Sequence, residues 1–163
     1  MERDRLFRVT LAYLLAAAAG YAVASIFFTS ANLIRLSAVG AEISFADALR
    51  TFLFDMRGMA PSMVWTQYGS LIFIGFAIAF PVAAFLRRVV LRSTGPIRKI
   101  ASYLFPIAGA TAIAVILLTS YPKYEVFMFA GARGAFGSLA QCLAGALAGY
   151  VFHLTLNKRE ARS

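Results

Sequence analysis

The chain has 163 residues, of which 61% are hydrophobic, and it carries a formal net charge of +9. A soluble domain is about 45–50% apolar, so this excess excludes an ordinary water-soluble globule and indicates membrane spans. The Lys and Arg residues flank the apolar stretches and do not form one continuous basic face, which excludes nucleic acid as the partner.

Four apolar stretches without Asp, Glu, Lys or Arg define the predicted fold class. They are residues 9–29, 66–86, 100–120 and 135–156. A helix of about 20 residues crosses the roughly 30 Å hydrocarbon core of a bilayer. Open sheets are excluded there because unpaired backbone groups are costly in lipid. We therefore predict an all-α membrane protein, an antiparallel four-transmembrane-helix bundle that forms a single domain over residues 1–163.

The first apolar stretch follows a charged N-terminal segment, as the core of a secretory signal peptide does. Ala22 and Ala24 give the small-x-small pattern of a cleavage site. However, the charged segment contains the acids Glu2 and Asp4, and the apolar run continues well beyond Ala24. We expect a retained membrane span, and cleavage before Ser25 is the alternative.

The long segment between the first two stretches contains a predicted amphipathic helix at about residues 44–57. Its apolar residues recur at helical spacing on one face: Phe45, Ala48, Leu49, Phe52, Leu53 and Met56. Ser44 and Asp47 resemble a capping box, and Gly58 suits the C-terminal end of a helix. We expect this extra helix to lie in the outer membrane interface as an anchor. The alternative is a lid over an outward cavity or a docking surface.

The distribution of basic residues predicts the orientation in the membrane. Eleven Lys and Arg residues lie in the N-terminal segment, the 87–99 loop and the C-terminal segment, whereas five lie in residues 30–65 and 121–134. Cytoplasmic loops carry the excess of Lys and Arg. We therefore predict a bacterial-type cytoplasmic (inner) membrane protein with its N- and C-termini in the cytoplasm.

Small residues repeat every four positions in two of the predicted spans, and this spacing keeps them on nearly one helix face. The predicted helix-packing residues are Gly137, Gln141, Gly145, Gly149, Ala12, Ala16, Gly20 and Ala24. Small residues let membrane helices approach closely. These rows either close the monomer or join two copies, and the sequence leaves both open.

The sequence offers little material for catalysis or cofactor binding. It contains one histidine, His153, and one cysteine, Cys142, so neither a metal set nor a two-histidine haem site can be assembled from one chain. We expect no metal and no cofactor, a structural hydrogen bond between helices for His153, and a buried apolar role for Cys142.

A group of cationic and aromatic residues on the predicted outer side is the candidate ligand site. It comprises Arg57, Arg133, Lys123, Tyr121 and Tyr124. Arginines beside a bundle mouth can hold the phosphate or carboxylate of an anionic, lipid-linked molecule. The alternative is ordinary solvated charge, whose ion pairs contribute little.

We predict that the protein is not an enzyme and acts as an accessory or scaffolding subunit that binds membrane lipids and other integral membrane proteins, or associates with itself. One alternative is a small homo-oligomeric transporter or channel with Gln141, Thr111 and Ser138 along a wet path. Another is an enzyme or binder for anionic lipid-linked substrates at the outer face, with a pocket under residues 44–57.

Overall fold

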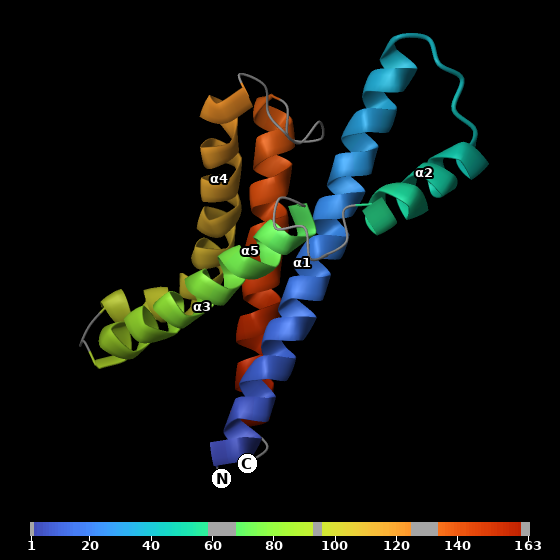
Figure 1. Ribbon diagram of the computed structural model, residues 1–163. Helices are drawn as coiled ribbons and strands as arrows, with labels where there is room; N and C mark the ends of the chain where they lie inside the picture. Colours follow the sequence, from blue (N-terminus) through green and yellow to red (C-terminus); the bar gives the residue numbers. More distant parts are fainter. Residues whose placement is uncertain (1, 59–67, 93–95, 125–133, 161–163) are drawn as a thin grey trace.

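The computed structural model describes residues 2–58, 68–92, 96–124 and 134–160, and all regular secondary structure in this part of the chain is helical, without a strand (Figure 1). The elements are α1 (Glu2–Ala38), α2 (Phe45–Gly58), α3 (Tyr68–Arg92), the 3-10 helix η1 (Pro96–Ser102), α4 (Leu104–Tyr124) and α5 (Ala135–Glu160). The all-α prediction is confirmed.

Three of these helices are long and apolar enough to cross a membrane. They are α1 over Leu6–Ala38, α3 over Tyr68–Arg92 and α5 over Ala135–Asn157. The chain is therefore a membrane protein. The apolar part of α4, Leu104–Thr119, is shorter, so the fourth span and the interfacial position of α2 stay predictions.

Helix α1 extends beyond the predicted span of residues 9–29. Its 37 residues correspond to a length of about 55 Å at 1.5 Å per residue. It ends in a turn in which the Gly40 N–H donates to the Ser37 carbonyl at 3.0 Å. Gly40 has a φ of 88°, the left-handed conformation that commonly ends a helix and that glycine adopts without strain. No glycine or proline lies between residues 30 and 39, which explains why the helix continues to this turn.

Helix α4 begins four residues later than the predicted span of residues 100–120, and Pro106 explains the difference. Proline has no N–H to donate and is tolerated in the first turn of a helix but not in its interior. The chain therefore forms a 3-10 turn first, in which the Tyr103 N–H donates to the Ile100 carbonyl at 2.9 Å. The first α-helical bond follows, from the Ile107 N–H to the Tyr103 carbonyl at 3.0 Å.

Helix α5 packs between α1 and α4, and glycine allows its close approach to α4 (Figure 1). A Cβ atom built on Gly109 would lie 2.0 Å from the Gly145 carbonyl oxygen, and one built on Gly149 would lie 2.0 Å from the Phe105 carbonyl oxygen. We call Gly109, Gly145 and Gly149 the glycine seam. Backbone meets backbone along this seam, so no larger side chain fits there.

Helix α3 crosses the other helices at a marked inclination (Figure 1). Its first turn lies near α1, and its last turn lies away from α1, on the side of the molecule where α4 begins (Figure 1). The prediction of a regular four-helix bundle did not include this inclination. Its consequence is that α1 and α3 diverge toward the last turn of α3.

Helix α2 forms at Phe45–Gly58, close to the predicted range of residues 44–57. Its first turn has reciprocal capping bonds: Asp47 N–H donates to Ser44 Oγ at 3.2 Å, and Ser44 Oγ–H donates to Asp47 Oδ2 at 2.6 Å. These bonds hold the pKa of the Asp47 carboxyl below its ordinary value. The capping box fixes where the helix starts.

Two side chains of α1 hold α2 in place. Thr29 donates a hydrogen bond of 2.9 Å to Asp55 Oδ2, and the Tyr21 hydroxyl donates to the Met56 carbonyl. No residue of α2 is buried. The C-terminal end of α2 therefore lies beside the second half of the predicted first span.

Candidate functional site

Aromatic side chains from three helices meet at the centre of the molecule. The rings of Phe80 in α3 and Phe152 in α5 are stacked, with centroids 4.6 Å apart. Phe105 of α4 contacts Phe152 edge-on at 5.0 Å. All three are less than 5% exposed. Aromatic pairs in these arrangements gain about 0.5–1.5 kcal/mol beyond their buried area, so they form a rigid cluster.

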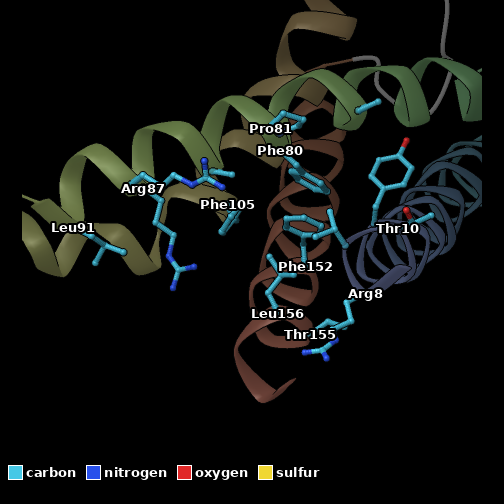
Figure 2. A pocket seen from close by; sticks show the side chains of 15 residues that line it. Arg8, Thr10, Phe80, Pro81, Arg87, Leu91, Phe105, Phe152, Thr155 and Leu156 are labelled. Carbon is cyan, nitrogen blue, oxygen red and sulfur yellow. The ribbon is translucent and has the colours of Figure 1, made fainter. Parts of the chain in front are cut away.

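This cluster forms the floor of a groove between the helices (Figure 2). The groove lies between the first turns of α1 and the second half of α3, and the end of α5 closes its base. Its volume is about 950 Å³. Binding pockets for small molecules commonly measure about 300–1,000 Å³, so the groove is large enough for part of an amphiphile.

Arginines line the groove beside the aromatic floor, and we call Arg8, Arg87 and Arg88 the arginine rim. Arg8 comes from α1, and Arg87 and Arg88 come from α3. Figure 2 shows Arg8 and Arg87 on opposite sides of Phe152. The groove therefore combines an apolar base with a cationic edge.

Arg87 is held in place by two neighbouring helices. Its Nη2 donates to Asn157 Oδ1 of α5 at 3.2 Å, and its guanidinium carbon lies 5.9 Å from the ring centroid of Phe105. A cation over an aromatic face is attracted by the ring quadrupole. Asn157 Nδ2 also lies 3.0 Å from His153 Nε2. This contact of His153 lies within α5. The hydrogen bond from Arg87 to Asn157 joins α3 to α5.

The structure does not bring the predicted outer ligand residues together in its described part. Arg57 is exposed in the last turn of α2. Tyr121, Lys123 and Tyr124 belong to the last turns of α4, but their side chains lie outside the described residues, as does Arg133. Helix α2 packs on α1, whereas α4 ends beside α5 (Figure 1). The ligand site at this group therefore stays a prediction.

The predicted helix-packing residues lie at helix contacts. Ala12, Ala16, Gly20 and Ala24 are buried in α1; Gln141, Gly145 and Gly149 are buried in α5; Gly137 is half-buried. A Cβ atom built on Gly20 would lie 2.7 Å from Cβ of Ala148. Gly109 is the partner of Gly145, and the four-residue pattern of small residues did not reveal it. The residues four positions before and after Gly109 are the large Phe105 and Ile113.

Gln141 serves a structural role in the described residues. It accepts a 2.7 Å bond from the Tyr68 hydroxyl at Oε1 and donates a 3.1 Å bond from Nε2 to the Ala24 carbonyl. It is 1% exposed, whereas Thr111 lies on the exposed surface of α4. These two residues therefore do not share a wet path within one copy of the chain.

The residues of the groove carried weak signals in the sequence. Phe76 and Phe80 are four residues apart and share one helix face, but Phe105 and Phe152 are isolated in their own spans. The arginines of the 87–99 loop indicated only the orientation of the chain in the membrane. Bringing these residues together required the inclination of α3, which no residue pattern reveals.

Among the residues that the structure describes, no group of three or more His, Cys, Asp or Glu side chains is placed to hold a metal ion. No protein-family model, curated protein or solved structure matches the chain. Its function is therefore inferred from the groove, the helix packing and the surface.

Proposed function

We propose that this protein is a non-catalytic accessory subunit of a bacterial-type cytoplasmic membrane, which binds membrane lipid and associates with other membrane proteins. The groove carries this proposal. An apolar floor beside a cationic rim fits an amphiphile, because the acyl part of such a molecule avoids water while its polar part needs a charged or polar partner.

The side chains around the groove favour binding over catalysis. Its lining in the described residues contains arginines, threonines and one tyrosine, Tyr13, but no carboxylate, histidine or cysteine. The Tyr13 hydroxyl donates to the Phe73 carbonyl at 2.6 Å. General acid–base or nucleophilic catalysis needs a base within hydrogen-bond reach of the reacting group, and this lining supplies none.

In the proposed arrangement four helices cross the membrane, and α4 is the fourth. The 16 residues of Leu104–Thr119 span about 24 Å, less than the roughly 30 Å core. Local thinning of the bilayer and the packing of α4 along α5 accommodate such a mismatch. Because α4 runs antiparallel to α5 (Figure 1), it returns the chain to the side on which α5 begins.

Helix α2 lies at the outer surface in this arrangement, with its C-terminal end tilted into the interface. Its apolar side chains Phe45, Leu49 and Leu53 are exposed, and lipid at headgroup depth would cover them. The bonds from Tyr21 and Thr29 limit how far α2 can move away from α1.

Exposed apolar side chains also cover the outer faces of the long helices, as on α1 at Leu14, Leu15 and Ile26. In a bilayer these faces contact acyl chains or the helices of another protein. Seven of the eight residues in the small-residue rows of α1 and α5 are buried inside the chain, so a partner would mainly contact these larger side chains. The accessory role rests on this surface together with the groove.

A substitution that fills the groove tests the proposal. Ala77 of α3 is exposed and lines the groove, whereas its neighbour Ile78 is 64% exposed and does not line it. We expect full-length protein purified in mild detergent to retain lipid, measured by native mass spectrometry. Ala77→Trp should lose most of this lipid, and the matched control Ile78→Trp should retain it. Equal retention by both variants would contradict the proposal.

A further inference from the structure

The arginine rim carries charge that the groove itself does not neutralise. Arg8, Arg87 and Arg88 contribute three positive charges to a lining that contains no Asp or Glu among the described residues. Arg8 also lies one helical turn from Asp4, which is outside the groove, so Arg87 and Arg88 carry most of the uncompensated charge. Charges of one sign beside a low-dielectric surface focus the electrostatic field and raise the local concentration of the opposite charge. The charge of the groove is therefore complementary to an anion.

Arg87 is the oriented member of the rim. Asn157 and the ring of Phe105 fix its guanidinium, yet among the described residues only Nη2 has a hydrogen-bond partner, and the buried Nε has none. A guanidinium has five N–H donors in a planar fork that matches the oxygens of a phosphate. Arg87 is thus prepared to bind an oxyanion at little cost in side-chain entropy.

The apolar floor decides what kind of anion fits. Phe80, Phe105 and Phe152 lie beside the rim, and Val9 and Leu91 extend the apolar lining toward the open sides of the groove. A soluble anion would leave this surface exposed to water, whereas an acyl chain would cover it and gain about 0.8 kcal/mol per buried CH₂ group. The bound molecule must therefore carry both an anionic group and an acyl chain.

We infer that the groove binds the phosphate headgroup of an anionic phospholipid, with an acyl chain on the aromatic floor. This inference rests on the proposed lipid-binding function and adds the headgroup class and the residue that selects it. The rim comes from the first turns of α1 and the last turns of α3, on the side that the excess of Lys and Arg predicts to be cytoplasmic. In the proposed arrangement the lipid phosphates of that leaflet lie there. Arg87 is the fixed anchor, and the exposed Arg8 and Arg88 supply further charge.

The test compares two lipids with identical acyl chains, phosphatidylglycerol and phosphatidylcholine, in competition for the purified full-length protein in neutral detergent. Native mass spectrometry measures the ratio of the two bound species. We expect a preference for phosphatidylglycerol of about tenfold, because both lipids carry the phosphate but phosphatidylcholine adds a choline cation that the arginines repel. Soluble glycerol 3-phosphate should not displace the lipid.

Three variants of the rim and one control variant assign the preference to the rim. Arg87→Gln should reduce the preference for phosphatidylglycerol toward one, and Arg88→Gln, at an exposed position, should reduce it in part. Arg50→Gln in α2 is the control, because Arg50 is exposed and belongs to a helix that packs on the far part of α1. Its preference should equal that of the unsubstituted chain. Arg87→Lys should recover only part of the preference, since a lysine cannot form the planar fork.

The outcomes separate this inference from the proposed function. If both lipids bind equally well and Ala77→Trp removes both, the groove binds lipid but does not select an anion, and the inference is wrong while the proposed function stands. If neither lipid is retained, the proposed function itself fails. If glycerol 3-phosphate displaces phosphatidylglycerol, the site recognises a free phosphate ester and the lipid assignment is overturned. Unchanged preference in Arg87→Gln and Arg88→Gln would also overturn the inference.

Discussion

The glycine seam gives the sharpest prediction about stability, through the substitution Gly109→Ala. The added Cβ would lie 2.0 Å from the Gly145 carbonyl oxygen and 2.9 Å from its carbon, and real Cβ contacts essentially never fall below 3.0 Å. Because the atoms in the way belong to the backbone of α5, no side chain can rotate aside. The two helices must separate by roughly 1 Å.

Such a separation weakens the packing along the whole seam. A gap of about 0.5–1 Å removes a quarter to a half of the dispersion attraction between the atoms involved, and overpacking of this kind costs about 1–3 kcal/mol. Alanine is better than glycine in a helix by about 1 kcal/mol, which offsets part of the loss. We therefore expect the free energy of unfolding of Gly109→Ala to fall by about 1–2 kcal/mol.

The control is Gly75→Ala, the same replacement in α3. Its Cβ would first meet Cδ1 of Ile116 at 3.1 Å, the end of a flexible side chain that can move by the few tenths of an ångström required. This variant should be as stable as the unsubstituted chain or slightly more stable. The assay is reversible unfolding in mixed micelles followed by circular dichroism. A Gly109→Ala protein as stable as Gly75→Ala would refute backbone contact at the seam.

Three further predictions concern the buried polar contact, the cap of α2 and the orientation. Tyr68→Phe removes the hydroxyl that donates to Gln141 and should lower the free energy of unfolding by about 0.6–1.7 kcal/mol, the range for polar contacts between membrane helices; the exposed Tyr103→Phe should leave it unchanged in the same micelle titration. The lowered pKa of Asp47 means that its capping contribution is complete above the ordinary carboxyl pKa and is lost as the pH falls through the lower folded value. Hydrogen exchange of α2 amides, corrected for intrinsic rates, should show protection that decreases with acid, and an Asp47→Ala variant that kept this pH dependence would contradict the assignment. Alkaline phosphatase fused after residue 163 should be inactive, whereas alkaline phosphatase inserted within residues 121–134 should be active. The reverse pattern would invert the proposed orientation.

Local patterns in the sequence predicted the helices well, because each of these signals is contained within one segment. Apolar length indicated the spans, and the Ser44 and Asp47 pair indicated the start of α2. The ends of α1 and the start of α4 were less predictable. They depend on Gly40 and on Pro106, which act on the backbone and not through hydrophobicity.

The candidate site could not be predicted, because it depends on how helices cross. Lys and Arg near a span have the same composition whether they face solvent, lipid headgroups or a groove, so Arg87 gave no signal beyond orientation. The contact between Gly109 and Gly145 likewise requires the register of α4 on α5. Register and crossing angle arise from packing between helices, so they leave no periodic pattern in the sequence of one helix.

The groove is a consequence of the different sizes of the residues at the three contacts of α5. Helix α5 contacts α1 through alanine and glycine and contacts α4 through the glycine seam, so α1 and α4 lie close to α5. It meets α3 through the stacked rings of Phe80 and Phe152, which hold the two backbones apart. A contact between backbones cannot widen without losing its dispersion energy, and the stacked rings hold α3 at a wider separation from α5. The space left between α1 and α3 is therefore set by packing inside the chain, and α3 carries Arg87 and Arg88 to its edge.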